Sequence, residues 1–295
     1  MLPTYPSAEE ARHEDGFLES KDGPRLHWRR FTPPAPRATV AVIPGGGDHS
    51  GRYPGLTTGL VRAGFEVALV DLRGHGQSDG RRWHVDAFGD YLHDMDAFMA
   101  RVRAGAAGRR VFVAGHSMGA LVAATWALAP KREGALAPGR EAAGFVFSSP
   151  YFKLKLDPPA LKILTARLVG TVVPWLPIST GLRVADLTTD EELQRWTLDD
   201  PLYGKPTTPR WFVESQKAQA ELMASAERFS APLLVLAGGS DPIADAVAAR
   251  DFFDRASSRD KEFKRYEGLR HEIFNERERE RTIGDAVAWL AARAD

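Results

Sequence analysis

The chain has 295 residues and a mass of 32.4 kDa, and its 39 Lys and Arg residues balance its 39 Asp and Glu residues. A protein with zero net charge lacks the positive surface of a general nucleic-acid binder, so we expect no nucleic-acid partner. Cysteine is absent, which excludes disulfides, thiolate catalysis and metal or iron–sulfur sites built on cysteine.

Nothing in the chain has the pattern of a signal peptide or a membrane span. Residues 1–16 are polar and acidic, without the positive start and apolar core of a secretory signal. The longest apolar stretch, Ala160–Leu176, is shorter than the about 20 residues that span a bilayer, and Lys162 and Arg167 interrupt it. The sequence therefore predicts a cytoplasmic protein.

Strand-like and helical patterns then alternate along the chain. Leu18–Arg30 holds two short strand-like runs around Lys21-Asp22-Gly23, which predicts a hairpin. Nearly continuous apolar runs, typical of strands buried on both faces, lie at Thr39–Ile43, Glu66–Asp71, Arg110–Ala114, Phe145–Ser148 and Leu233–Ala237, with a last strand at Glu262–Tyr266. Apolar residues at helical spacing occur at Asp90–Arg103, Ser117–Leu128, Asp245–Ala256 and Thr282–Ala292. This alternation predicts an α/β fold with a mostly parallel, doubly wound sheet.

The alternation stops between Tyr151 and about Ser230. We expect an inserted helical cap here, with residues 1–152 and 231–295 forming the core domain and residues 153–230 the cap. The stretch Ala160–Leu176 is apolar around nearly the whole circumference of a helix. It has two interpretations: ordinary packing of the cap on the core, or a lid that lines an acyl-chain tunnel and contacts a lipid surface.

The sharpest chemical signal is GHSMG at residues 115–119, between a predicted strand and a predicted helix. A serine nucleophile needs such a tight turn, because the turn exposes Oγ while Gly115 and Gly119 leave room for neighbouring chain. The N–H groups at the start of the helix face developing negative charge. Ser117 is therefore the candidate nucleophile, and the alternative is a tight turn with an inert serine.

A serine nucleophile needs a base that a carboxylate orients. In α/β-hydrolases the chain order is serine, acid, histidine, and of the eight histidines only His271 follows Ser117. The acid is expected where a parallel strand ends, because ligands bind at that edge of the sheet. Asp241, after Leu233–Ala237, is the first candidate, whereas the alternative Asp245 is expected to cap the next helix.

The tetrahedral intermediate of acyl transfer needs two backbone N–H donors around its oxyanion. One is expected at Met118, directly after the nucleophile. The other is expected in Pro44–Ser50, PGGGDHS, which we name the oxyanion loop, because its three glycines let the backbone approach a substrate. The alternatives are an ordinary glycine-rich turn and a phosphate-binding loop. No Lys-Ser or Lys-Thr pair follows, which argues against a nucleotide P-loop.

These motifs together resemble a known family. The ordered set is GGGDHSGRY (45–53), DLRGHGQSDG (71–80), GHSMG (115–119), SDPIAD (240–245) and His271. It is similar to the monoacylglycerol lipase and lysophospholipase (serine aminopeptidase-like hydrolase) family of the α/β-hydrolase superfamily. The similarity extends from about Glu19 to the C-terminus and includes DPLYG (200–204) and PRWF (209–212) in the cap.

The resemblance implies Ser117 as nucleophile, Asp241 as acid and His271 as base, with the N–H groups of Gly46 and Met118 as oxyanion donors. The family usually begins its oxyanion loop with His-Gly, whereas this chain has Pro-Gly at residues 44–45. Proline lacks an N–H, but the donor is expected two residues later, so we expect a stiffened or re-aimed loop that still functions.

Other residues of these motifs have less direct roles. His49 and Arg52 match the family's HSxRY positions, and we expect them to brace the oxyanion loop rather than contact substrate; His75 is expected to be structural. The candidate substrate contacts are nevertheless Gly45, His49, Leu161, Leu164 and Leu168.

The predicted function is hydrolysis of carboxylic esters of lipids, monoacylglycerols or lysophospholipids, through an acyl-enzyme and without a metal or organic cofactor. In the lid interpretation, Lys153, Lys155 and Lys162 would lie near anionic headgroups, and the cap would make peripheral contact with a membrane. The same triad also fits a small-ester carboxylesterase, a thioesterase, a carbon–carbon bond hydrolase or a cofactor-free haloperoxidase. A non-catalytic ligand-binding protein of this fold is the alternative from a different class.

Overall fold

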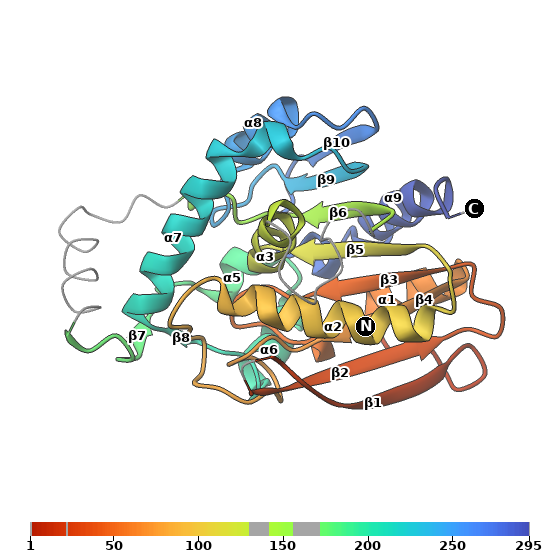
Figure 1. The fold of residues 1–295 in the computed structure, drawn as a ribbon, viewed down its shortest axis with the longest axis horizontal. Helices are drawn as coiled ribbons and strands as arrows, with labels where there is room; N and C mark the ends of the chain where they lie inside the picture. Colours follow the sequence, from red (N-terminus) through yellow and green to blue (C-terminus); the bar gives the residue numbers. More distant parts are fainter. Residues whose placement is uncertain (1, 22, 130–141, 156–171, 295) are drawn as a thin grey trace.

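The computed structural model describes residues 2–21, 23–129, 142–155 and 172–294, and a large sheet lies between two layers of helices (Figure 1). Eight strands form it in the order β1-β2-β4-β3-β5-β6-β9-β10. Their bounds are β1 Arg12–Glu19, β2 Arg25–Thr32, β3 Ala38–Ile43, β4 Phe65–Val70, β5 Val111–His116, β6 Gly144–Ser148, β9 Leu233–Gly238 and β10 Lys261–Tyr266. The strands predicted after the hairpin are each found, with ends shifted by at most two residues.

The strands from β4 to β10 in the sheet order are parallel, and the hairpin β1–β2 adds an antiparallel edge next to β4. Every residue of β3, β4, β5, β6 and β9 is buried. Helices cover both faces of these strands, which is why their sequences are continuously apolar instead of alternating. The hairpin is longer than Leu18–Arg30 because β1 begins with the charged residues 12–15, which carry no apolar signal.

The two faces of the sheet carry separate apolar cores. The helices over one face are α2 (Asp90–Ala106), α3 (Met118–Leu128) and α8 (Ala246–Arg255), and those over the other are α1 (Pro54–Arg62) and α9 (Arg279–Ala291). The ends of α2, α3, α8 and α9 differ from the predicted ends by three residues or fewer. The sequence does not predict α1, PGLTTGLVR, because its glycines and threonines have poor helix propensity; packing against α9 and β4 stabilises it.

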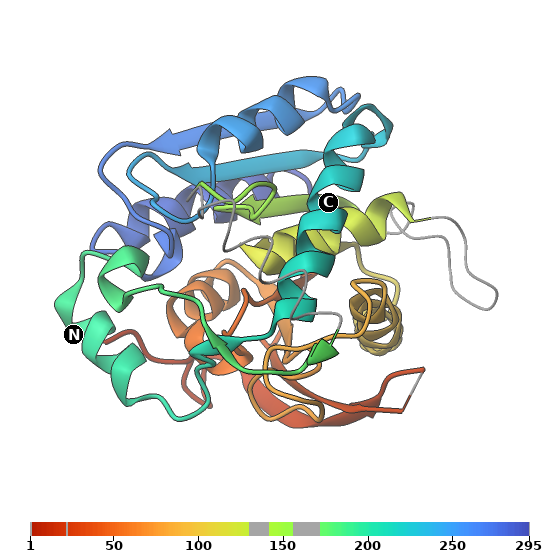
Figure 2. The same ribbon diagram turned by 90° about the vertical axis from the view of Figure 1, so that its left-hand side faces the viewer.

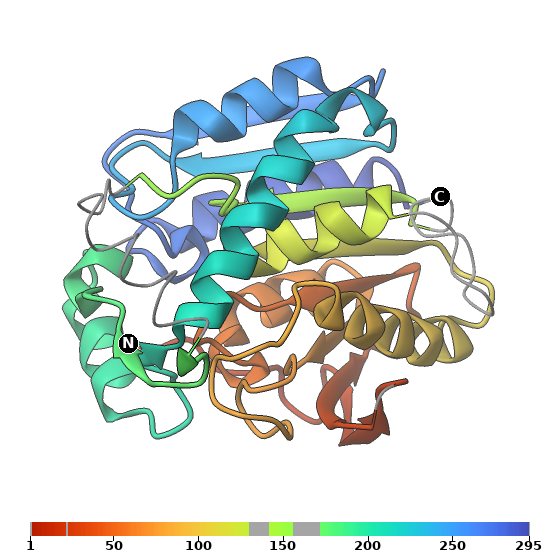
Figure 3. The same ribbon diagram turned by 60° about the vertical axis from the view of Figure 1, so that its left-hand side comes forward.

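The chain leaves the sheet after β6 and returns at β9. The described elements between them are β7 (Ile178–Ser179), α5 (Val184–Leu187), α6 (Glu191–Asp199), β8 (Pro206–Thr207) and α7 (Pro209–Ala224). The long helix α7 lies beside the end of the sheet towards which β5 and β6 point, and it packs against α3 (Figures 1 and 2). Figure 3 shows α5 and α6 on the same side of the molecule as the lower end of α7.

We refer to residues 153–230 as the cap, and its division from the core stays a prediction. Trp211 and Leu222 of α7 belong to the same apolar cluster as α3, so the described part of the cap shares a core with the sheet. Most of the predicted lid helix, with Leu161, Leu164 and Leu168, lies outside the described residues. No helix among those described is long and apolar enough to cross a membrane.

Candidate active site

Ser117 occupies the sharp turn between β5 and α3. Its φ of +51° and ψ of −116° are unfavourable for a residue with a side chain, and the strand and helix on either side hold it there. Because of this conformation α3 begins at Met118, one residue later than predicted. A Cβ on Gly119 would clash with the backbone of Ile43, and one on Gly115 would lie 2.7 Å from the Cα of Ala120. Both glycines of the motif are therefore needed for the close approach of β3, β5 and α3.

Ser117, His271 and Asp241 form a continuous chain of hydrogen bonds. Nε2 of His271 lies 2.8 Å from Oγ of Ser117, and Nδ1 of His271 lies 2.7 Å from Oδ2 of Asp241. All three side chains are buried. The structure thus brings together the three residues that the sequence analysis selects, at the ends of β5 and β9 and in the loop after β10.

The loop after β9, residues 239–245, which we name the acid loop, fixes the carboxylate of Asp241. Its Oδ1 accepts the N–H groups of Ile243, at 2.7 Å, and Ala244, at 3.1 Å, which leaves Oδ2 for His271. Asp245 instead accepts the N–H of Val247 and caps α8, as predicted. The geometry therefore separates the two candidate acids.

The environment of His271 shifts its pKa upwards. Burial alone would lower this pKa, but the charge and hydrogen bond of Asp241 outweigh it, and the carboxylates of Glu272 and Asp48 act in the same direction. With Nδ1–H donated to Asp241, the lone pair of Nε2 faces Oγ of Ser117. An imidazole nitrogen of raised pKa is thus placed against the hydroxyl.

The oxyanion loop follows β3 directly. The N–H of Gly45 donates to the hydroxyl of Tyr53, at 3.3 Å, and this hydroxyl donates to Asp48, at 2.6 Å. Gly45 is therefore engaged within the protein. The N–H groups of Gly46 and Met118 have no partner among the described residues, which leaves both groups for a substrate oxygen.

Trp83 is a residue of this site that the sequence analysis missed. Its indole lies against the oxyanion loop: a Cβ on Gly46 would be 2.6 Å from Cζ2, and one on Gly47 would be 2.7 Å from Cζ3. The indole also lies edge to face against Trp211 of α7, with the ring centroids 5.2 Å apart. Trp83 has a φ of +43°, unusual for so large a residue, and its N–H donates to the carbonyl of Gly74. Nothing in the polar sequence around Trp83 indicates that its side chain lies against the oxyanion loop.

Arg52, which exposes 1% of its surface, is the centre of a buried network of charges beside the triad. Its guanidinium pairs with Asp48 at 2.9 Å, with Glu272 at 3.0 Å and, more distantly, with Asp200 at 3.9 Å. Burial disfavours the charged guanidinium, but these carboxylates outweigh burial and raise the pKa of Arg52. The cation thus joins the oxyanion loop, the residue after His271, and the cap.

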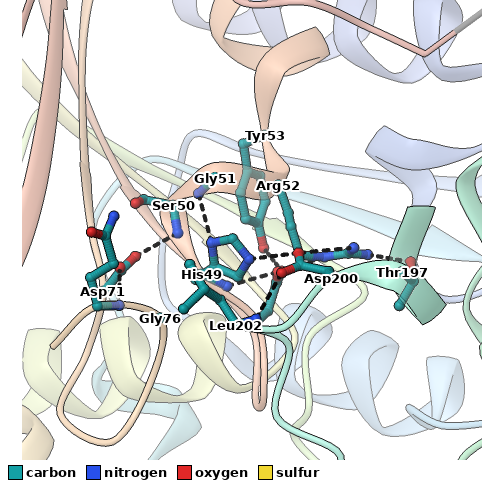
Figure 4. Close-up of polar contacts among 12 residues, drawn as sticks. His49, Ser50, Gly51, Arg52, Tyr53, Asp71, Gly76, Thr197, Asp200 and Leu202 are labelled. Carbon is teal, nitrogen blue, oxygen red and sulfur yellow. Dashed lines mark hydrogen bonds and ion pairs between the residues drawn. The ribbon is translucent and has the colours of Figure 1, made fainter.

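The cap encloses Arg52 on its remaining sides. Nη2 donates to Oγ1 of Thr197 at 2.9 Å (Figure 4). The rings of Trp196 and Tyr203 each lie 4.9 Å from the guanidinium carbon. A cation between aromatic faces is stabilised by the ring quadrupoles, most strongly where water is excluded. No motif shows this network, because Glu272 lies 220 residues from Arg52 in the sequence.

His49 has a partner on each ring nitrogen (Figure 4). Nδ1 accepts the N–H of Gly51 at 3.1 Å, so the proton is on Nε2, which donates to Oδ2 of Asp200 at 2.8 Å. This arrangement favours bracing over substrate contact. The ring of His75 lies buried with Nδ1 2.9 Å from the carbonyl of Arg73, and burial lowers its pKa, which favours the structural interpretation.

The described residues include no group of three or more His, Asp or Glu side chains arranged to hold a metal ion. The other candidate substrate contacts divide into two sets. Gly45 and His49 lie in the oxyanion loop with the partners given above, and the three cap leucines lie outside the described residues.

Comparison with known proteins gives the family. Residues 34–278 match the family model described as "Serine aminopeptidase, S33". Phospholipase YtpA of Bacillus subtilis is 31% identical over 86% of this chain and 95% of its own length. Human monoglyceride lipase is 30% identical over 88% of this chain and 84% of its own length. The crystal structure of Paleococcus ferrophilus monoacylglycerol lipase superposes with a TM-score of 0.80, at 28% identity, over 91% of this chain and 99% of that one.

Proposed function

The chain belongs to the serine aminopeptidase S33 family of α/β-hydrolases, and from this premise we propose that it hydrolyses lipid carboxylic esters, monoacylglycerols or lysophospholipids. The family and the α/β-hydrolase fold expected from the motifs are confirmed, and the protein is an enzyme, a hydrolase. The observation that carries the proposal is the hydrogen-bonded chain from Ser117 through His271 to Asp241.

In the first step of the proposed reaction, Oγ of Ser117 attacks the ester carbonyl while Nε2 of His271 takes its proton. Asp241 holds the ring through Nδ1–H and stabilises the imidazolium. The carbonyl oxygen becomes an oxyanion, to which the N–H groups of Gly46 and Met118 donate. His271 then returns the proton to the leaving alcohol, and the acyl-enzyme remains.

In the second step, His271 takes a proton from water, and the resulting hydroxide attacks the acyl carbonyl. The bond to Oγ of Ser117 breaks, the serine regains its proton from His271, and the fatty acid leaves. No group beyond these side chains, the two N–H donors and water takes part in the scheme.

Two observations favour a lipid ester over a small ester. Phospholipase YtpA and human monoglyceride lipase, which match most of the chain, are named for lipid substrates. One short segment of the cap, residues 172–176, also exposes apolar side chains: Val172 is 75% exposed, and Trp175 and Leu176 are 47% and 45% exposed. Such a segment fits peripheral contact with a lipid surface, and the insertion of residues 153–230 would form the lid above the site.

The test is hydrolysis by the purified protein of monoacylglycerols, lysophosphatidylcholine and p-nitrophenyl esters of increasing chain length, with Ser117→Ala beside it. We expect turnover to be greatest with a long-chain lipid and to be lost in the variant. Activity confined to acetate and butyrate esters would contradict the lipid substrate and leave a small-ester hydrolase. A protein that resists a fluorophosphonate probe and turns over no ester or thioester would be a ligand-binding relative.

A further inference from the structure

The cap contacts the oxyanion loop through its own backbone. The N–H of Gly204 donates to the carbonyl of Gly47 at 2.7 Å, and a Cβ on Gly47 would clash with the carbonyl oxygen of Gly204. The backbones of the two segments are therefore in direct contact, with no room for a side chain at position 47. Gly47 directly follows Gly46, the proposed oxyanion donor, so a shift of the cap here would move that donor.

A second contact, between Asp200 and His49, fixes the same pair of segments. Oδ1 of Asp200 accepts the N–H of Leu202 at 2.9 Å, and Oδ2 accepts Nε2–H of His49. An asparagine at position 200 would keep the first bond and present its NH2 group to the N–H of His49, two donors facing each other. The contact therefore requires a carboxylate on the cap side.

The acid loop is held by the beginning of the cap in a similar way. Leu154 and Ala244 form an antiparallel bridge, and the N–H of Lys155 donates to the carbonyl of Ile243 at 2.8 Å. Nζ of Lys155 reaches further and donates to the main-chain carbonyl of Asp241 at 2.6 Å. Backbone and ammonium together fix the residue that orients the base.

The loop after β10, residues 267–276, which we name the base loop, has its own contacts with the cap. The N–H of Glu272, next to His271, donates to the carbonyl of Leu187 at 2.8 Å. Oγ1 of Thr188 donates to the carbonyl of Asn275 at 2.8 Å. The segment at the end of α5 therefore packs on the base loop as the segment after α6 packs on the oxyanion loop.

We propose that the cap positions all three catalytic loops, and that Asp200 and Lys155 are positioning residues of the cap for the oxyanion donor and for the acid. The proposal rests on the triad of the proposed function. Three separate cap segments, 153–155, 187–188 and 200–204, each hold one loop. Seating of the cap is then a condition for turnover of every ester, including esters too small to need an acyl-chain tunnel.

The decisive substrate is therefore p-nitrophenyl acetate. Asp200→Asn should lower kcat on this ester by about 10- to 100-fold, the range expected when a reacting geometry is displaced by a fraction of an ångström, with KM little changed. Asp199→Asn is the matched control, because the side chain of Asp199 is exposed and makes no hydrogen bond or ion pair with the described residues. It should retain the wild-type kcat.

Lys155→Met tests the acid loop independently. It should lower kcat on the acetate ester and Lys155→Arg should restore much of it, whereas Lys217→Met, on an exposed lysine of α7, should have no effect. Circular dichroism and the Tm of each variant show that it is folded. The proposal is overturned if folded Asp200→Asn and Lys155→Met keep the wild-type kcat on acetate and change only KM for long chains. The proposed function fails separately, if Ser117→Ala retains turnover.

Discussion

The centroids of the His116 and His271 imidazole rings lie 5.0 Å apart, yet the surroundings of the two rings shift their pKa values in opposite directions. Burial and the neighbouring His271 lower the pKa of His116 to about 3, and no carboxylate pairs with its ring among the described contacts. The charge of Asp241 overcomes burial at His271 and raises its pKa. The ring of His116 therefore stays neutral at ordinary pH, and the ring of His271 is the one that gains and loses a proton.

The acid limb of kcat/KM against pH is expected to follow His271. The imidazole must be neutral to take the serine proton, so activity falls as pH decreases through its pKa, which lies above the usual value for histidine. A pH profile with a p-nitrophenyl ester measures this limb. His116→Gln should leave its midpoint in place, because a neutral ring contributes no charge. A midpoint below the usual histidine range would contradict the assigned environment.

Replacing the two aspartates near the end of β9 should have unequal effects. Asp241→Asn removes the group that orients His271 and should lower kcat by about 10⁴-fold, as in other triads. Asp245→Asn keeps a good helix cap and should retain both turnover and Tm. Steady-state kinetics of the two variants on one ester, beside Ser117→Ala, make the comparison. An Asp241→Asn protein that keeps the wild-type kcat would remove Asp241 from the proposed triad.

Removing the buried charge of Arg52 should destabilise the fold. In Arg52→Met the carboxylates of Asp48 and Glu272 lose their cation, and breaking a buried pair of this kind costs about 3–5 kcal/mol. Urea unfolding measures the loss. Arg250→Met, which breaks the exposed pair with Asp254 on α8, is the control and should leave the urea midpoint nearly unchanged. A stable Arg52→Met protein would show that water already screens the network.

Because Trp83 lies against Gly46, a substitution of Trp83 should restore part of the kcat lost in a Gly46 variant. Gly46→Ala places a Cβ against the indole, so the oxyanion loop must move and kcat should fall by about 10- to 100-fold. Trp83→Leu in the same protein removes the clashing ring edge and should recover part of this loss. A double-mutant cycle of kcat tests the coupling, and additive losses would show that the two residues act independently.

The sequence predicts the parts of this molecule in which local pattern and tertiary position agree. The strands of the parallel sheet are buried on both faces, so their apolar runs have one interpretation. Ser117, Asp241 and His271, the proposed catalytic residues, follow the carboxyl ends of β5, β9 and β10, in the chain order expected of an α/β-hydrolase. The same logic separates Asp241 from Asp245, because the first residues after a strand face the site and the next ones begin a helix.

The residues that brace the site could not be found in this way. Arg52 is visible as a motif residue, but besides Asp48 its charge is balanced by Glu272 and by Asp200 of the cap, both distant in the sequence. Trp83 contacts the oxyanion loop from a backbone with a φ of +43°, whose N–H donates to Gly74 and whose carbonyl accepts the hydroxyl of Thr207 in the cap. The helix α1 has poor propensity and is stabilised by its neighbours. Each depends on tertiary contacts, which a single sequence does not record.

The outer strands of the sheet have a consequence for the behaviour of the protein in solution. The free sides of β1 and β10 pair with no other described strand, and each would offer a row of backbone donors and acceptors to a second molecule. β1 carries Arg12, Glu14 and Asp15, and β10 carries Lys261 and Lys264. Charges along such edges oppose edge-to-edge pairing with the sheet of another molecule, which leads to aggregation. The charged outer strands thus keep the sheets of two copies from pairing along their edges.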